Sequence, residues 1–243
     1  MTSYWQDTRR PRYSLLFVLP LLLLYEALAA TLGGEGVAVV RNGADVLLKS
    51  VFVVLGGHRG VLLFGVLLLV AGAALVVADV RRHGLPRLGP FLGMTVESVT
   101  YAALLGGAAG TLTSLLLGAG PLAAGAAAAF DLRTQLVLSL GAGLYEELLF
   151  RVLLVTALLA LARRGFGWGG KAAGAFAVVV AALVFSDFHY VGPYGDRLAL
   201  GSFTYRAVAG LLLSGLYVAR GFGITAWSHA LYDVGLAVAG GWS

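Results

Sequence analysis

The chain has 243 residues and a formal net charge of +5; 59% of its residues are hydrophobic and only 12% are charged, and its mean hydropathy is +0.89. Soluble domains carry about 25% charged residues, so this composition excludes an ordinary soluble enzyme and a disordered chain. The lack of cysteine excludes disulfides, thiol nucleophiles and cysteine-ligated metals. No basic cluster with interleaved aromatic residues is present, so we expect no nucleic-acid partner.

Long apolar segments separated by Gly, Pro and Arg fill most of the chain. They lie at about 13–32, 37–56, 61–79, 91–118, 132–162, 172–190, 202–219 and 222–240. A spanning helix needs roughly 20 mostly apolar residues. In lipid, only helices and closed barrels satisfy the backbone hydrogen bonds. The pattern therefore predicts an all-α fold, a polytopic transmembrane bundle of seven or eight helices, which forms a single integral membrane domain over 1–243.

The first apolar segment is predicted to be a retained membrane helix. The polar start before it contains Arg9 and Arg10, and the apolar run that follows is about 20 residues long. Ala27-Leu28-Ala29 lies inside that run and no Ala-x-Ala cleavage site follows it, so the pattern is not typical of a cleaved signal peptide.

The second segment, 37–56, leaves the number of crossings open. Arg41, Asp45 and Lys49 are spaced by four and form one charged stripe down a helix. Such a helix either lies at the interface or crosses with its stripe facing other helices. Crossing almost removes the charge bias between the two sides. Without crossing, one side would be cytoplasmic and would carry these basic residues: Arg9, Arg10, Arg12, Arg81, Arg82, Arg87, Arg163, Arg164, Lys171 and Arg220. The charge rule alone favours seven crossings.

Ionisable residues inside a membrane are costly and indicate functional sites by default. The candidates are Glu26, Glu97, Glu146, Glu147, Arg151, His189, His229 and Asp233. The last six lie in the C-terminal half of the chain, on three different apolar segments.

Glu146 and Glu147 are adjacent carboxylates in the middle of a long apolar segment. Neighbouring helical residues point about 100° apart, so the two acids cannot share one role. Glu147 and Arg151 are four apart and are predicted to pair. Glu146 then projects toward another face, where it is free to act as a base. The alternative, a structural Glu147–Arg151 ion pair alone, leaves Glu146 without a partner.

Two histidines complete a candidate hydrolytic centre. His189 lies near the end of the sixth segment, where a lone histidine is often merely interfacial. His229 and Asp233 are four apart on one helical face, and a local His–Asp hydrogen bond is the simpler explanation of that pair. Together with Glu146, however, the histidines could activate water: a glutamate takes the proton, and imidazoles hold the water and the developing oxyanion.

The chain resembles the CAAX protease and bacteriocin-processing family, also called the ABI family, over roughly 91–240. It carries Glu-Glu-x-x-x-Arg at 146–151, Phe-x-x-x-His at 185–189 and His-x-x-x-Asp at 229–233, in the order of that family's three motifs. Type II CAAX prenyl endopeptidases are the eukaryotic and archaeal branch. The N-terminal helices, 1–90, lie outside the resemblance.

The resemblance implies an intramembrane glutamate protease with eight helices in a multi-pass protein of a prokaryotic plasma membrane. It implies a membrane-embedded or lipid-anchored protein or peptide as the substrate and no cofactor. In that family, the first Glu and the middle His hold the hydrolytic water, and the last His and its partner line the oxyanion site. The residues that match are catalytic Glu146, His189, His229 and Asp233, with Glu147 and Arg151 in support.

One position departs from the prenyl endopeptidases, which have Asn where this chain has Asp233. A carboxylate can donate to an oxyanion only when it is protonated. The alternative is a zinc site in which Asp233 is a ligand beside Glu146, His189 and His229. No His-Glu-x-x-His motif is present.

Two other functions stay open at this point. One is a non-enzymatic membrane scaffold or bacteriocin-immunity protein that keeps the helical core. The other is a proton-coupled transporter that uses Glu97, Glu146 and the histidines. Retention of Glu146 with both histidines favours the enzyme, because a scaffold needs none of them.

Overall fold

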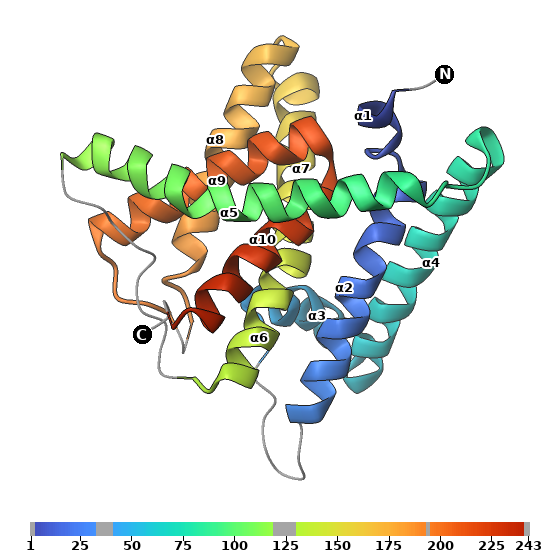
Figure 1. Cartoon of the computed structure of the whole chain (residues 1–243), viewed down its shortest axis with the longest axis horizontal. Coiled ribbons are helices and arrows are strands. Elements are labelled where there is room, and N and C mark those ends of the chain that lie inside the picture. The colour runs from blue at the N-terminus through green and yellow to red at the C-terminus, as the bar shows by residue number, and fades with distance from the viewer. Residues whose placement is uncertain (1–2, 33–40, 119–129, 193–194, 241–243) are drawn as a thin grey trace.

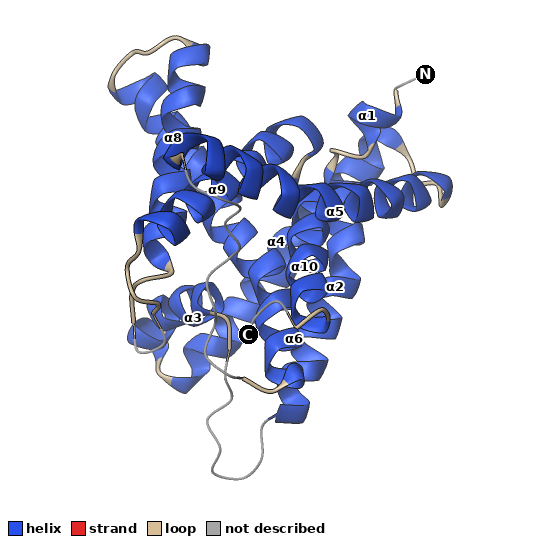
Figure 2. Ribbon diagram, turned by 60° about the vertical axis from the view of Figure 1, so that its left-hand side comes forward, coloured by secondary structure: helices blue, strands red, loops and turns tan. Residues whose placement is uncertain are grey.

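The computed structural model describes residues 3–32, 41–118, 130–192 and 195–240, and every regular element in these ranges is a helix (Figure 2). This confirms the predicted all-α membrane fold. The elements are α1 (Tyr4–Asp7), α2 (Pro11–Leu32), α3 (Gly43–Gly56), α4 (His58–His83), α5 (Gly89–Leu117), α6 (Leu132–Gly141), η1 (Ala142–Val155), α7 (Thr156–Ala160), η2 (Leu161–Gly165), α8 (Gly170–Phe188), α9 (Leu200–Arg220) and α10 (Phe222–Val238). Within the described ranges, the helices long and apolar enough to cross a membrane are Pro11–Leu32, Arg59–His83, Gly89–Leu117, Gly170–Phe188 and Leu200–Arg220.

The fifth predicted segment is one uninterrupted helical run made of α6, η1, α7 and η2. Asp131 caps its start, because the aspartate side chain accepts a hydrogen bond from the backbone N–H of Thr134. The middle of the run, η1, is a π-helix and not the ordinary α-helix that the composition predicts. Apolar composition predicts a helix in lipid, but it does not distinguish α-helical from π-helical hydrogen bonding. The i→i+5 hydrogen bonds of a π-helix occur frequently at functional sites.

The second predicted segment is shorter than expected. Its helix, α3, begins at Gly43, directly after the N-cap residue Asn42, and residues 37–40 lie outside the described residues. A helix of 14 residues is about 21 Å long, against a hydrocarbon core of about 30 Å. α3 is thus too short to cross a bilayer by itself.

The charged stripe of α3 faces the neighbouring helix α2. Asp45 is fully buried and lies 2.6 Å from Lys49 Nζ and 3.1 Å from Arg41 Nη1. Glu26 of α2 lies 3.0 Å from Arg41 and 3.3 Å from Lys49. The stripe thus faces another helix, as the crossing alternative predicts, but the length of α3 does not support the crossing itself.

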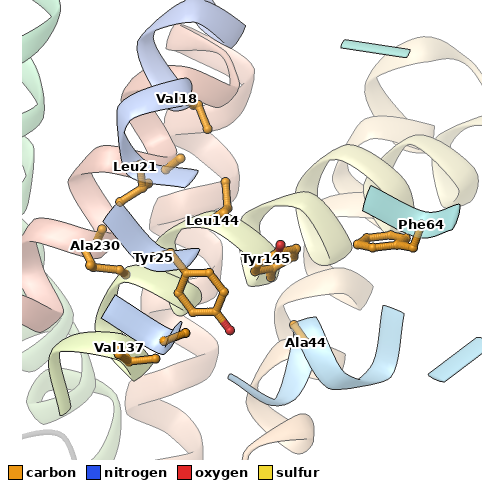
Figure 3. Close-up of a cluster of buried hydrophobic side chains, with 12 residues drawn as sticks. Val18, Leu21, Tyr25, Ala44, Phe64, Val137, Leu144, Tyr145 and Ala230 are labelled. Atoms are coloured by element: carbon orange, nitrogen blue, oxygen red, sulfur yellow. The ribbon is translucent and has the colours of Figure 1, made fainter. Parts of the chain in front are cut away.

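The largest hydrophobic cluster joins α2, α3, α4, α6, η1 and α10 (Figure 3). Its centre is aromatic: the ring centroids of Tyr25 and Tyr145 are 5.3 Å apart, and those of Phe64 and Tyr145 are 6.5 Å apart. Ala44 of α3 and Ala230 of α10 are fully buried in the same cluster. The N-terminal helices and the C-terminal helices therefore share one core.

The last helix, α10, lies at the centre of the bundle, with α5 crossing in front of it (Figure 1). It packs against α2, α5, α6, η1 and α9. Its approach to η1 requires glycine at position 143, because a Cβ there would lie 2.4 Å from the carbonyl oxygen of Ala226. This close contact brings the motif at 229–233 alongside the motif at 146–151.

Arg220 forms a second buried charge cluster, between α9, α5 and the N-terminus. Its guanidinium donates to both carboxylate oxygens of Glu97, at 2.7 and 2.9 Å, and to Thr8 Oγ1 at 2.9 Å. It also stacks over the Trp5 ring at 3.9 Å. Glu97, a candidate functional residue in the sequence, is therefore the partner of a structural arginine.

We predict that Arg220→Met lowers the melting temperature of the protein in detergent. The substitution leaves the Glu97 carboxylate without its charged partner, and breaking a buried pair costs about 3–5 kcal/mol in soluble proteins. The double variant Arg220→Met/Glu97→Gln removes both charges and should recover part of the loss. A single variant that melts at the wild-type temperature would contradict this role of the pair.

Candidate active site

Three elements carry the six residues predicted for the site. They are Glu146, Glu147 and Arg151 on η1, His189 directly after α8, and His229 and Asp233 on α10. The buried ring of Phe185, on α8, lies beside both histidines. Its centroid is 4.9 Å from that of His189 and 6.0 Å from that of His229. The structure thus places both imidazoles against one aromatic ring.

Glu147 binds an arginine and a histidine. Its Oε1 lies 3.0 Å from Arg151 Nη1 and 2.7 Å from His229 Nδ1. The carboxylate is fully buried, as is the arginine. The ion pair predicted from the i,i+4 spacing is confirmed. The bond to His229 was not predicted, because the two residues are 82 positions apart. Glu147 therefore connects η1 to α10 as well as to its own helix.

Arg151 connects η1 to two further helices. Its Nη2 donates to the carbonyl oxygen of Gly210 on α9, at 3.4 Å. The guanidinium carbon lies 4.4 Å from the centre of the Phe185 ring on α8. A carboxylate, a carbonyl and an aromatic face therefore surround the buried guanidinium, although its Nε and Nη1 have no hydrogen-bond partner among the described residues. Arg151 thereby joins η1 to α9 and to α8, the helix that precedes His189.

Glu146 has a different environment from its neighbour. Its Oε1 accepts a hydrogen bond from Asn42 Nδ2 at 2.8 Å, and its Oε2 is buried with no hydrogen-bond partner among the described residues. Glu146 is thus held through one oxygen by a neutral amide, while the other oxygen has no hydrogen-bond partner in the described chain.

His189 has one ring nitrogen bound and one available. Its Nδ1 lies 2.8 Å from the carbonyl oxygen of Phe185. A carbonyl only accepts hydrogen bonds, so Nδ1 donates, and in the neutral ring Nε2 then carries the lone pair. The chain after His189 is tied back by the backbone N–H of Asp196, which donates to the His189 carbonyl oxygen at 3.0 Å. Residues 193–194 of the predicted break lie outside the described residues.

His229 lies between two carboxylates. Its Nδ1 donates to Glu147, and its Nε2 is 3.5 Å from Asp233 Oδ2. The local His–Asp contact expected from the i,i+4 spacing is therefore present. Both ring nitrogens face acceptors, so the orientation of this imidazole is fixed from both sides.

The site contains more negative than permanent positive charge. Glu146, Glu147 and Asp233 are three carboxylates, whereas Arg151 is the one guanidinium among the six site residues. Burying uncompensated charge is costly, so the net charge of the site depends on how many protons its carboxylates and imidazoles hold. Groups that exchange protons within one buried site are suited to general acid–base chemistry.

A bound metal ion needs several ligand side chains placed around one point. Across the described ranges, no group of three or more His, Asp or Glu side chains is placed to hold a metal ion. A structural zinc site needs four ligands, and a catalytic one needs three with an open position.

The hydrogen bond between Asn42 and Glu146 was not predicted from the sequence. An asparagine directly before an apolar run is a recognised helix-start signal, and this signal could have placed the beginning of α3. Nothing in the local sequence links it to Glu146, which is 104 residues away.

Residues 128–235 match the family model described as type II CAAX prenyl endopeptidase Rce1-like. The match includes all three motifs and confirms the resemblance, although it begins at 128 and not near 91. Taken with the apolar helices, this similarity to a family of proteases indicates a multi-pass membrane protein. Neither the curated proteins nor the solved structures contain a match to the chain.

We predict that Glu147→Ala lowers the folded yield and the melting temperature in detergent. The substitution leaves Arg151 buried without its carboxylate, a loss of about 3–5 kcal/mol in soluble proteins, and frees His229 from its partner. The adjacent Glu146→Gln is the matched control, since it keeps side-chain size and should melt close to wild type. Equal melting temperatures for the wild type, Glu147→Ala and Glu146→Gln would show that Glu147 has no supporting role.

Proposed function

We propose that the chain is an intramembrane endopeptidase that hydrolyses a peptide bond with water activated by Glu146 and His189. The observation that carries the proposal is that the buried Glu146 carboxylate is held by a neutral amide: its Oε1 accepts a hydrogen bond from Asn42, and its Oε2 has no hydrogen-bond partner in the described chain. The Oε2 of Glu147 also lacks a hydrogen-bond partner among the described residues, but Arg151 and His229 contact this carboxylate through Oε1 and compensate its charge, so Glu147 is less suited to the role. The similarity of residues 128–235 to CAAX endopeptidases supports the same reaction.

In the proposed reaction, Glu146 takes a proton from water as the water oxygen attacks the carbonyl carbon of the substrate. The lone pair of His189 Nε2 accepts the second hydrogen bond of that water and orients it. Glu146 then returns its proton to the amide nitrogen as the C–N bond breaks. The products are a carboxylic acid and an amine, so one water is consumed and Glu146 is regenerated.

The developing oxyanion needs a donor, and His229 is the group best placed to supply one. Its Nδ1 is fixed by Glu147, so its Nε2–H points away from η1 toward the Asp233 side. An imidazole N–H that is held in place stabilises an oxyanion without reorganising. Before the reaction, Asp233 Oδ2 lies 3.5 Å from His229 Nε2 and orients the ring. As the oxyanion develops, it replaces Asp233 as the acceptor of this N–H, so Asp233 does not itself donate, which accommodates the carboxylate where prenyl endopeptidases have Asn.

The proposed substrate is a membrane-embedded or lipid-anchored protein or peptide that reaches the site from the bilayer of a prokaryotic plasma membrane. The name of the matched family makes a prenylated CAAX peptide the first substrate to test. Burial of Glu146 and Glu147 among apolar helices supports a substrate delivered within the membrane, because a water-soluble chain would not partition there. Neither a cofactor nor a nucleic acid enters the proposal.

We predict that Glu146→Gln abolishes cleavage. Wild-type protein is reconstituted in phosphatidylethanolamine–phosphatidylglycerol vesicles with a farnesylated peptide that ends in a CAAX sequence, and products are measured by mass spectrometry. New peptide termini in membranes of cells that express the chain are mapped in parallel, which detects unprenylated substrates. Glutamine cannot accept the proton of water, so both signals should be lost.

Glu97→Gln is the control for this experiment, because it changes a glutamate outside the site. It should keep turnover at temperatures below its melting point. Wild-type turnover by Glu146→Gln would end the glutamate-base mechanism. Termini that are the same with and without the chain, together with an uncleaved peptide, would instead favour the non-enzymatic scaffold.

We predict that Asp233→Asn keeps turnover within about tenfold of wild type, since the amide oxygen of asparagine can still accept a hydrogen bond from His229 Nε2. Asp233→Ala should lose more, because nothing then orients the ring. Metal analysis of the purified wild type accompanies the assay. Stoichiometric zinc in the wild type, lost together with activity in Asp233→Asn, would overturn the metal-free mechanism in favour of a zinc site.

A further inference from the structure

We infer that Asn42, at the start of α3, is a positioning residue for Glu146. This inference rests on the proposed function, in which Glu146 is the general base. Asn42 lies outside the segment that matches the protease family, and none of the three motifs includes it. Its role follows from contacts between the N-terminal helices and η1.

The Asn42 amide makes two hydrogen bonds, one as an acceptor through Oδ1 and one as a donor through Nδ2. Its Oδ1 accepts from the backbone N–H of Ala44 at 2.9 Å, which caps the start of α3. Its Nδ2 donates to Glu146 Oε1 at 2.8 Å. Turning the amide over would place a carbonyl against the carboxylate and an NH₂ group against an N–H, so the cap fixes which end faces Glu146. A single buried side chain thereby starts a helix and holds the proposed base.

α3 is anchored so that this amide has little freedom to move. Asp45, one turn further on, accepts a hydrogen bond from Tyr25 at 2.7 Å and pairs with Lys49 and Arg41. Figure 3 shows the Tyr25 hydroxyl directed toward the segment of α3 that carries Ala44. The charged stripe of α3 therefore acts as a clamp on α2 that fixes the position of Asn42.

The neighbouring helix is also shaped to admit Asn42. A Cβ on Gly141 would lie 2.6 Å from the Asn42 Cβ and 2.7 Å from the Tyr25 ring. Glycine at 141 lets the start of α3 lie directly against the end of α6, five residues before Glu146. The contact between Asn42 and Glu146 thus depends on backbone approach as well as on the side chains.

The hydrogen bond from Asn42 to Glu146 Oε1 determines the direction in which Oε2 points. A glutamate side chain that is bound at one oxygen presents the other in a fixed direction, whereas an unbound carboxylate samples several rotamers. Hydrogen bonds to charged groups are among the stronger ones in proteins, so the loss of this bond should lower kcat by about 10- to 100-fold. Substrate binding does not involve Asn42 in this scheme, so KM should stay close to wild type.

The test separates the helix cap from the bond to Glu146. Asn42→Ser keeps a good N-cap but is too short to reach the carboxylate, whereas Asn42→Ala loses both functions. We expect equal falls in kcat for the two variants, measured with the farnesylated peptide in vesicles, and a lower melting temperature only for Asn42→Ala. Wild-type kcat in folded Asn42→Ser would overturn the inference. If Asn42→Ser does not fold, Asn42→Thr, which also caps a helix and is too short to reach the carboxylate, takes its place under the same criterion.

A spectroscopic measurement on the same proteins does not depend on turnover. The infrared difference between wild type and Glu146→Gln identifies the carboxyl band of Glu146, and Asn42→Ser should shift that band because its hydrogen bond is lost. An unshifted band would contradict the inference. Glu146→Gln also separates the two hypotheses: wild-type turnover by Glu146→Gln rejects the proposed base, whereas an inactive Glu146→Gln beside a fully active Asn42→Ser rejects the role of Asn42 alone.

Discussion

The arrangement of the site depends on one buried carboxylate, that of Glu147. A charge taken out of water must be compensated by partners close to it, and Glu147 finds them in Arg151 of its own helix and His229 of α10. Because the contact with His229 is 2.7 Å long, it fixes how α10 lies against η1. The same contact brings His229 to the residue next to Glu146, so the structural ion pair and the proposed chemistry lie side by side.

The carboxylates of Glu97, Glu26 and Glu146 differ in how their oxygens are used. Glu97 has both carboxylate oxygens bound to Arg220, and Glu26 has both bound by Arg41. These pairs join helices and leave no oxygen for a reaction. Glu146 instead has a neutral amide on one oxygen and no hydrogen-bond partner in the described chain on the other. Burial alone does not identify a functional carboxylate among apolar helices; the kind of partner does.

The site is assembled by helices from both halves of the chain. Residues 128–235 contain the three motifs that match the protease family, yet Asn42 and the clamp around Asp45 come from the N-terminal helices. The shared core around Tyr25 and Tyr145 makes this possible, since it packs α2 and α3 directly against η1. A segment that looks peripheral in the sequence therefore touches the proposed base.

The sequence by itself determined the helical fold, because lipid leaves the backbone few other ways to satisfy its hydrogen bonds. It also determined the Glu147–Arg151 and His229–Asp233 contacts, since i,i+4 spacing places both members on one helical face. Only the tertiary structure decided the Glu147–His229 and Asn42–Glu146 bonds, whose partners are 82 and 104 residues apart. No local spacing rule reaches that far; such contacts arise when helices pack, and here glycines at 141 and 143 set how closely they do so.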